Sequence, residues 1–267
     1  MFMKPKYSIL ITNYNTANTI KASLESILSQ IEDSDSFEVI VVDNMSNDGS
    51  ERILREFESQ GKIKLISARC SRGKGRQIAF ENSKGQVLII NMDMDTIFKP
   101  RLKEVLKMYH QFEKKYEKFI LSFNGGAVVS RKLVKEVGGW RDLQRGEDTE
   151  LRWRLEMTGA VCVDSGINMI EQHFLSWEHK GILYTLYDKY VLLRDKLRVG
   201  KSMKELFFGE ERNGRWKTVH GSIIYVVLLL VAKITYKFKP CYNTYNLYKK
   251  YKKGEGDGSK HRVNNMG

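Results

Sequence analysis

The sequence predicts an α/β fold in which a mixed, mainly parallel sheet is flanked by helices. Between residues 7 and 98, short apolar runs rich in Val and Ile alternate with segments whose apolar residues recur at helical spacing. Several of these runs end in a cluster of Asn, Asp, Ser or Thr, and ligands of parallel sheets bind beyond the carboxyl ends of the strands. A chain of 267 residues is long enough for one large domain with an appended segment.

Strands and helices alternate regularly in the first half of the chain. Each expected strand is a short run of β-branched and other apolar residues, at 7–12, 37–42, 63–66 and 87–90. Helices are expected at 20–31, around 53–57 after a polar loop that ends at Ser50, and, after a loop at 69–75, near 76–83. Because crossovers between parallel strands are right-handed, the polar ends of these strands are expected to converge on one crevice.

The second half is expected to be less regular. Helices are predicted at 101–118, briefly before the turn Gly138-Gly139-Trp140, and from Gly146 onward, and strands at 119–123, 127–130, 161–163 and 168–170. Residues 254–267 are rich in Gly, Lys and Asn without core residues, and we expect them to be disordered.

The net charge of +13 is unevenly distributed along the chain. Residues 201–267 hold 14 Lys and Arg against 5 Asp and Glu, which is +9 and leaves only +4 for residues 1–200. A nucleic-acid-binding domain would carry its basic residues on the folded domain, so we expect no nucleic-acid partner. The basic end instead predicts contact with an anionic membrane surface.

The cysteines and the N-terminus favour a reducing compartment. Cys70, Cys162 and Cys241 are odd in number and far apart, which fits neither a disulfide framework nor a zinc site. Lys4, Pro5 and Lys6 lead directly into the first strand, so no signal peptide is expected.

Two carboxylates, Asp93 and Asp95, follow the apolar run Val87–Ile90 directly. Side chains two residues apart along a strand point the same way, so these acids are expected to face one ligand together. Paired carboxylates at the end of a buried strand suit a hard divalent cation, Mg²⁺ or Mn²⁺.

Four motifs in this order resemble the family 2 glycosyltransferases, which have the GT-A fold. The motifs are Ser8–Asn15, Val41–Ser50, Asp93–Asp95 and Gly146–Asp148, and the resemblance covers roughly residues 7–180. It implies a nucleotide-sugar donor, a divalent metal and inversion at the anomeric carbon. We therefore expect a catalytic domain at 1–180, with a nucleotide-sugar half at about 1–98 and an acceptor half at about 99–180, followed by a helical segment at 181–253.

The resemblance points to residues for the nucleotide-sugar. Asp43 can accept hydrogen bonds from the base or ribose, although it also suits a turn-former in its Asn-rich loop. Thr12 and Tyr14 are expected to flank the base, Tyr14 by stacking, unless they form only a strand-to-helix turn. The basic run at 72–76 suits a diphosphate before a helix N-terminus, with Arg76 in the position where relatives often carry arginine; a solvated basic loop is the alternative.

The metal would neutralise the nucleoside diphosphate as it leaves. The resemblance implies Asp95 as the direct ligand, with Asp93 as the ribose partner or a further contact to the metal. His173 occupies the position where relatives have a histidine that reaches the same metal, His179 is the fallback, and a purely structural histidine is the alternative.

A second acidic pair, Glu147 and Asp148, opens a predicted helix. Inverting transfer is a single displacement in which the acceptor hydroxyl must lose a proton, and a carboxylate can take it. The resemblance assigns Asp148 as the base and Glu147 as a partner of the acceptor hydroxyl. The alternative is that both acids only complement the helix dipole.

The C-terminal segment combines apolar and basic residues. Residues 219–232 are mostly apolar with positive flanks on both sides, which favours a helix lying on an anionic membrane surface over one that spans it or packs as an ordinary core helix. Tyr242, Tyr245, Tyr248 and Tyr251 recur among lysines and are expected to suit the headgroup region. The cytoplasmic face of the cell membrane is the expected location.

Together these features predict a metal-dependent inverting glycosyltransferase of the hexosyltransferase type, with a glycan or lipid-linked acceptor. A sugar-1-phosphate nucleotidyltransferase shares the sheet and metal but would need a Gly-rich loop where residues 12–15 read Thr-Asn-Tyr-Asn. A non-catalytic membrane or RNA-binding protein would explain the basic end but not the presence of every acidic motif.

Overall fold

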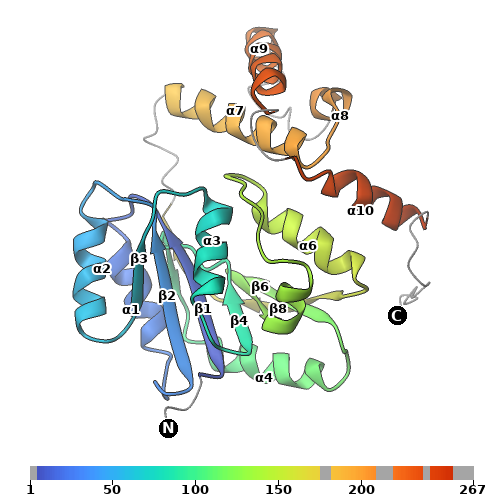
Figure 1. The fold of residues 1–267 in the computed structure, drawn as a ribbon. Helices are drawn as coiled ribbons and strands as arrows, with labels where there is room; N and C mark the ends of the chain where they lie inside the picture. Colours follow the sequence, from blue (N-terminus) through green and yellow to red (C-terminus); the bar gives the residue numbers. More distant parts are fainter. Residues whose placement is uncertain (1–4, 175–181, 209–218, 237–240, 255–267) are drawn as a thin grey trace. The chain divides into compact units, whose positions relative to one another are not determined.

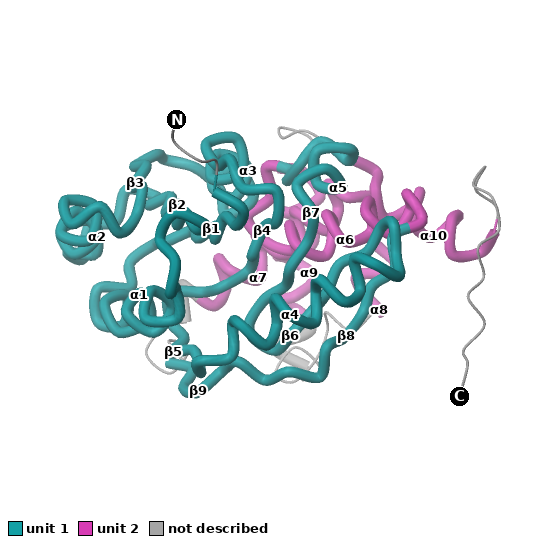
Figure 2. The backbone as a smooth tube through the Cα atoms, turned by 90° about the horizontal axis from the view of Figure 1, so that it is seen from below, with its two compact units in different colours: residues 1–141, 160–176 teal, residues 142–159, 177–267 magenta. Residues whose placement is uncertain are grey.

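The computed structural model describes residues 5–174, 182–208, 219–236 and 241–254 (Figure 1). The chain divides into two compact units, and Figure 2 colours them separately. Unit 1 comprises residues 1–141 and 160–176, and unit 2 comprises residues 142–159 and 177–267. Each unit is described by itself below.

Unit 1 is built on a mixed sheet. Within the described residues its strand order is β3-β2-β1-β4-β7-β6-β8. The strands are β1 (Tyr7–Asn13), β2 (Phe37–Asp43), β3 (Lys64–Ser67), β4 (Val87–Ile90), β6 (Phe119–Asn124), β7 (Gly126–Ser130) and β8 (Val161–Asn168). Neighbouring strands from β3 to β4 are parallel, as are β6 and β8, whereas β7 runs antiparallel to both of its neighbours. The prediction of a mixed, mainly parallel sheet is confirmed.

A small antiparallel ribbon lies beside this sheet in the same unit. It pairs β5 (Thr96–Phe98) with β9 (Ile170–His173), and Thr96 stands opposite His173. The sequence did not predict β5, because three residues are too few for a period to be recognised. The pairing matters for function, since it brings His173 to the residues that follow β4.

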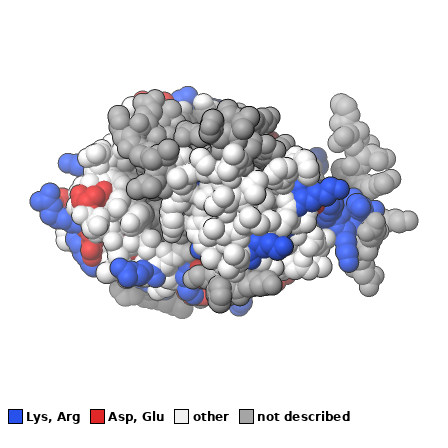
Figure 3. All heavy atoms as spheres, turned by 90° about the horizontal axis from the view of Figure 1, so that it is seen from above, with Lys and Arg blue, Asp and Glu red and all other residues white. Residues whose placement is uncertain are grey.

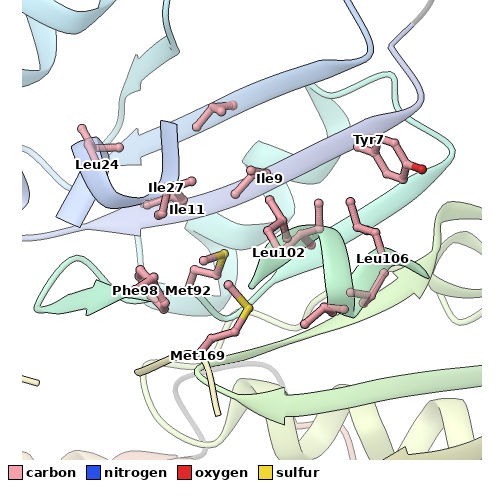
Figure 4. Close-up of a cluster of buried hydrophobic side chains, with 14 of the residues drawn as sticks. Tyr7, Ile9, Ile11, Leu24, Ile27, Met92, Phe98, Leu102, Leu106 and Met169 are labelled. Atoms are coloured by element: carbon pink, nitrogen blue, oxygen red, sulfur yellow. The ribbon is translucent and has the colours of Figure 1, made fainter. Parts of the chain in front are cut away.

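Helices cover the two faces of the sheet. They are α1 (Ile20–Leu28), α2 (Ser50–Ser59), α3 (Arg72–Glu81), α4 (Leu102–Glu113) and α5 (Arg131–Glu136). On one face, Ile9 and Ile11 of β1 pack with Leu24 of α1 and Leu102 of α4 in the main hydrophobic core (Figure 4). Alternate residues of the same strands face the other way, where α3 packs on β1 and β2.

Helix α3 begins earlier than predicted. The sequence suggested a loop at 69–75 because glycines are poor helix formers, yet α3 begins at Arg72. Ser71 caps it, since its hydroxyl accepts a hydrogen bond from the backbone N–H of Lys74 at 3.1 Å. Gly75 is needed for close packing, because a Cβ there would lie 3.0 Å from Cγ2 of Thr12. The predicted loop therefore holds for residues 69–71 and is wrong for residues 72–75, where the basic run forms the first turn of a helix.

Other boundaries differ from the predictions by a few residues. Helix α1 ends at Leu28 and α4 at Glu113, both earlier than expected, whereas β8 continues to Asn168. The boundaries of helices and strands depend on capping and tertiary pairing, which hydrophobic periodicity does not report.

Unit 2 consists of helices in the part of the chain that the structure describes. They are α6 (Glu147–Met157), α7 (Ile182–Arg198), α8 (Met203–Phe208), α9 (Val219–Thr235) and α10 (Thr244–Lys253). No helix among the described residues has both the length and the apolar character required to cross a membrane.

Helices α6 and α10 are joined by a hydrogen bond to a buried carboxylate and by aromatic stacking. Arg154 donates hydrogen bonds to both carboxylate oxygens of Glu150, and the hydroxyl of Thr244 donates to the same carboxylate at 2.6 Å. The ring of Trp153 stacks on that of Tyr248 with centroids 5.5 Å apart. These contacts explain why residues 142–159 group with the C-terminal helices, whereas the sequence assigned them to the acceptor half of the catalytic domain. The predicted disordered tail lies outside the described residues, apart from Gly254.

We expect the substitution Gly85→Ala to destabilise unit 1. Gly85 precedes β4 and lies against β1, where a Cβ would be 2.5 Å from the hydroxyl oxygen of Ser8 and 2.6 Å from its backbone nitrogen. Relieving that overlap would displace β4 from β1, at a cost of about 1–3 kcal/mol in the free energy of unfolding. Urea denaturation measures the loss. The exposed neighbour Lys84→Ala is the control and should change stability by no more than about 0.5 kcal/mol; equal effects would contradict the close approach.

Candidate active site

The ends of β1 and β2 are joined by the carboxylate of Asp43. Asp43 pairs in register with Asn13 and is wholly buried. Its Oδ1 accepts hydrogen bonds from Nδ2 of Asn13 at 2.7 Å and from the hydroxyl of Ser46 at 2.6 Å, and its Oδ2 accepts one from the backbone N–H of Ser46 at 2.8 Å. The carboxylate therefore holds the loops after both strands in one arrangement.

Further side-chain bonds link the same two loops. Asp48 accepts hydrogen bonds from the backbone N–H groups of Ala17 and Ser50, and Asn15 accepts one from the backbone N–H of Asn47. Tyr14 lies in this framework with 57% of its surface exposed. An exposed ring on a rigid loop suits the predicted stacking on a base, which stays a prediction.

The loops after β1, β2 and β4 share an unusual backbone conformation. Asn15, Met45 and Asn91, one after each strand, have φ angles of 51°, 54° and 66°. Left-handed φ costs a non-glycine residue roughly 1 kcal/mol, and asparagine tolerates it best. Such residues cluster where a chain must turn sharply to present neighbouring side chains to a ligand.

Arg76 connects α3 to the loop after β4. Its Nη1 donates a hydrogen bond to Oδ1 of Asn91 at 2.7 Å, and its Nη2 lies 3.8 Å from Oδ1 of Asp93. The arginine side chain is only 5% exposed, whereas that of Asp93 is 56% exposed. The structure thus places Arg76 behind the Asp93 carboxylate, where it sets the position of that group.

The two acids after β4 face away from the core, but they do not extend a strand. Met92 and Met94 are buried in the main core, while Asp93 and Asp95 alternate with them on the open side. The strand itself ends at Ile90, and the left-handed Asn91 turns the chain before the acids. The two acids lie on one side, as expected from the spacing of two residues. The alternation of buried and exposed residues, however, arises in a turn that the buried Met92 and Met94 hold against the core.

Asp95 lies beside His173. Oδ1 of Asp95 is 3.6 Å from Nδ1 of His173, and the same ring nitrogen is 3.1 Å from the hydroxyl of Thr96. Partial burial raises the pKa of the Asp95 carboxyl above its usual range, the negative charge of Asp93 adds to the rise, and His173 opposes it. The structure brings Asp95 and His173 together as predicted, while the fallback His179 lies outside the described residues.

The donor atoms here fit a divalent cation. Across the described ranges, no three His, Cys, Asp or Glu side chains converge into a complete metal cage. Mg²⁺ and Mn²⁺ need only one or two protein carboxylates when substrate phosphates supply further oxygens. Asp95, whose pKa is raised by burial and by the charge of Asp93, together with Asp93 and the imidazole of His173, forms such a partial set.

The Gly138-Gly139-Trp140 turn is attached to α3. Oε1 of Gln77 accepts a hydrogen bond from the backbone N–H of Trp140 at 2.7 Å, and the Trp140 ring contacts Phe80 edge-on. Gln77 follows Arg76 directly, so one helix holds both the acidic loop and this turn. Sequence reasoning missed Gln77 and Asn91; for Asn91, an asparagine directly between a strand and an acidic pair was the available signal.

Unit 2 carries the other acidic pair at the start of α6. Gly146, with φ of 75°, precedes the helix, Glu147 is buried, and Asp148 is partly exposed. The helix N-terminus favours negative charge, and Glu150 in the same turn has Arg154 as its partner. Of the two predicted residues, Asp148 is the more accessible.

Asp195 of α7 holds the loop that leads to these acids. Its Oδ2 accepts hydrogen bonds from the backbone N–H groups of Gln144 at 2.7 Å and Arg145 at 3.1 Å, and its Oδ1 accepts one from Arg198 at 3.1 Å. Both side chains of the Asp195–Arg198 pair are buried. Sequence reasoning did not identify Asp195, because a single acid in an amphipathic helix carries no local signal.

The fold and the strand-end residues define the class of the protein. A mainly parallel sheet in which β2 ends at Asp43 and β4 leads into the turn with Asp93 and Asp95 resembles that of GT-A glycosyltransferases. The chain belongs to glycosyl transferase family 2, since residues 8–169 match that family.

Proteins with similar sequences include glycosyltransferases of known and of uncharacterised activity. An uncharacterised glycosyltransferase of Nostoc, alr2836, is 28% identical over 108 residues, which are 39% of this chain and 33% of that protein. The poly(ribitol-phosphate) β-N-acetylglucosaminyltransferase TarS of Staphylococcus aureus is 30% identical over 135 residues, which are 49% of this chain and 23% of that protein. The matched part of this chain thus spans a third or less of these relatives.

Solved structures with the same fold hold sugar nucleotides. The mannosyltransferase PcManGT of Pyrobaculum calidifontis, in complex with GDP-Man and Mn²⁺, superposes with a TM-score of 0.58 at 15% identity, covering 96% of this chain and 77% of that one. Residues 1–349 of S. aureus TarS with UDP-GlcNAc give 0.56 at 13% identity, covering 96% and 93%. At these identities the likeness concerns the fold alone.

We expect Asp195→Ala to destabilise unit 2 strongly. The substitution removes the carboxylate that the buried Arg198 and two backbone N–H groups share, which costs about 3–5 kcal/mol in the free energy of unfolding. Asp188→Ala on the same helix breaks a more exposed pair with Arg145 and should cost about 1 kcal/mol or less. Chemical denaturation compares the two, and equal losses would show that Asp195 is not the central contact.

Proposed function

We propose that this protein is an inverting glycosyltransferase, which moves a sugar from a nucleoside-diphosphate sugar to an acceptor hydroxyl by a single displacement. The observation that carries the proposal is the Asp95–His173 pair beside Asp93, at the end of a central strand in a family 2 domain. This arrangement suits the charge that develops on a departing diphosphate.

The donor is proposed to lie over the loops after β1, β2 and β4. Tyr14 offers an exposed ring for the base, with Thr12 beside it at the end of β1. Arg72 and Lys74 lie in the first turn of α3, where helix N–H groups and positive charge favour a phosphate. The neighbouring structures named above hold UDP-GlcNAc and GDP-Man, so we propose a hexose or N-acetylhexosamine donor.

For Asp43 and Arg76, both predicted to contact the donor, we propose an indirect role in which each positions a neighbouring group. Asp43 is wholly buried with both oxygens engaged, so in this structure it acts on the base site through the loop that it holds. Arg76 is likewise buried, and we propose that it orients Asp93 toward the ribose or the metal. Direct contact of Asp43 or Arg76 with the donor stays a prediction.

Asp95, Asp93 and His173 are the residues that would hold Mn²⁺ or Mg²⁺. When bound, the cation supplies positive charge to the diphosphate oxygens as the sugar leaves. The protein's own contribution is to keep two carboxylates on one side of the turn after β4, through the buried Met92 and Met94 and through Arg76.

Asp148 is proposed to take the proton of the acceptor hydroxyl. It is partly exposed at the N-terminus of α6, where negative charge is favoured, and Asp195 fixes the preceding loop. Glu147, which is buried, is proposed to position the acceptor or the base. We propose a glycan, polyol-polymer or lipid-linked acceptor; the polyol polymer is suggested by the relative TarS, a poly(ribitol-phosphate) β-N-acetylglucosaminyltransferase.

We expect Asp95→Ala to lower sugar transfer at least a hundredfold while the protein remains folded, because it removes the proposed ligand that lies beside His173. Nucleotide release from a panel of sugar nucleotides, with and without Mn²⁺, measures the effect. Asp35→Ala, which removes an exposed carboxylate elsewhere in unit 1, is the control and should leave the rate unchanged. Full activity of Asp95→Ala would refute the metal assignment.

We expect Asp148→Asn to retain donor binding but to lower transfer by about 10²–10⁴-fold, the usual contribution of a general base. Calorimetric titration with the donor measures binding, and incorporation of labelled sugar in a membrane extract measures transfer. Glu147→Gln is the comparison, because the same loss of charge at the buried neighbour should reduce transfer less. Unchanged turnover of Asp148→Asn would place the base elsewhere.

A further inference from the structure

Helix α9 packs on its own unit with only one face. Tyr225, Leu229 and Ala232 are buried in a cluster with Leu193 and Leu197 of α7 and with Leu206 of α8. The hydroxyl of Tyr225 donates a hydrogen bond to the backbone carbonyl of Leu206, and Tyr190 of α7 donates one to Thr235. This face of α9 therefore attaches the helix to α7 and α8.

The opposite face of α9 is apolar and exposed. Its large side chains are between 40% and 66% exposed: Ile223, Ile224, Val227, Leu230, Val231 and Ile234. Positions 223, 227, 230 and 234 fall at helical spacing on one stripe, with 224 and 231 beside it. A contiguous exposed apolar stripe marks a binding surface, because single exposed apolar residues are ordinary but grouped ones are not.

The helices that support α9 add to this character. Tyr187 on α7 is 62% exposed and Phe208 on α8 is 75% exposed. We call the six α9 residues together with Tyr187 and Phe208 the exposed apolar set of unit 2. In the described part of the chain, outside unit 2 only Tyr14 and Met45 are large apolar residues with comparable exposure.

Basic residues accompany the exposed apolar set. Residues 219–254 contain seven lysines and no Asp or Glu. Lys233 is exposed on α9 next to Ile234, and Lys250 and Lys253 are exposed on α10. Figure 3 colours Lys and Arg blue and uncharged residues white, and in that view several Lys and Arg border an uncharged area.

We propose that the exposed face of α9 binds the surface of an anionic lipid membrane, with the helix lying in the interfacial plane. The apolar stripe can bury its side chains among the acyl chains, and the lysines, with no acids beside them, can bind the anionic headgroups. A second copy of this chain would bring lysines against lysines at this face, because residues 219–254 hold no acid, whereas anionic headgroups complement them. The attachment would keep the enzyme at the membrane, and this consequence alone rests on the proposed function.

The tyrosines of α10 do not belong to this surface. The sequence suggested that Tyr242, Tyr245, Tyr248 and Tyr251 suit the headgroup region. In the structure Tyr245 and Tyr248 pack on Trp153 of α6, and the hydroxyl of Tyr248 donates a hydrogen bond to Glu156. That expectation is wrong for these two residues, because their rings fasten α10 to α6.

Vesicle co-sedimentation of the full chain tests the proposal. We expect the wild type to bind vesicles of phosphatidylcholine with phosphatidylglycerol, to bind pure phosphatidylcholine more weakly, and to lose affinity at about 1 M salt, where surface charge is screened. The double variant Val227→Glu/Leu230→Glu should lower the partition coefficient at least tenfold. The variant Ser59→Glu/Gln60→Glu, which adds the same charges to exposed positions at the end of α2, should bind like the wild type.

Three outcomes would overturn the membrane assignment. The first is wild-type binding by Val227→Glu/Leu230→Glu, and the second is no binding of the wild type to the anionic vesicles. The third is a wild-type dimer in analytical ultracentrifugation that becomes monomeric in the variant without any vesicle binding, which would give the face to a second copy. Circular dichroism checks folding, and Ile234→Glu replaces the double variant if that one does not fold. Nucleotide release, measured separately, should not change in the variants, so the proposed function is tested independently.

Discussion

The buried carboxylate of Asp43 is the contact on which the nucleotide end of unit 1 depends. A fully buried carboxylate is tolerated only when hydrogen bonds replace its hydration. Asn13 and Ser46 together donate three hydrogen bonds to the carboxylate of Asp43. Because Asn13 ends β1 and Ser46 follows β2, the requirement to satisfy one carboxylate forces both strand ends into a single geometry. Tyr14 can then be exposed on a loop that is itself rigid.

Unit 2 uses the same device at its own acidic pair. Asp195 is buried, accepts two backbone N–H groups of the loop before α6, and is neutralised by Arg198. In both units a buried aspartate fixes the conformation of a loop through hydrogen bonds. The loop in turn holds a neighbouring, more exposed side chain in a defined position. A buried aspartate of this kind fixes the geometry of a loop, so a sequence motif that contains one does not show by itself whether the carboxylate also contacts a ligand.

The sequence was sufficient to predict the mainly parallel sheet. It also predicted those site residues that lie in local motifs or at positions given by the family resemblance. Alternating apolar runs gave the order of strands in the first half, and the resemblance placed His173 beside Asp95, which are far apart in the chain. The sequence was insufficient where tertiary contacts determine the start of a helix or the unit to which a segment belongs. Ser71 and the close approach at Gly75 start α3 within a glycine-rich run, and the Glu150–Arg154–Thr244 contact assigns residues 142–159 to the C-terminal helices. Neither has a periodic signature.

The two acids of the Asp93–Asp95 pair differ in what surrounds them, and the difference bears on which of them binds a cation. Asp93 is largely exposed and already has a guanidinium behind it, at 3.8 Å from Arg76. Asp95 is more buried, and both its burial and the charge of Asp93 raise the pKa of its carboxyl. A carboxylate whose charge is penalised in the free protein gains the most when a cation arrives, whereas one with a fixed counter-ion gains less. Arg76 therefore makes the surroundings of the two acids unequal, which supports our proposal of Asp95 as the direct ligand with Asp93 as its neighbour.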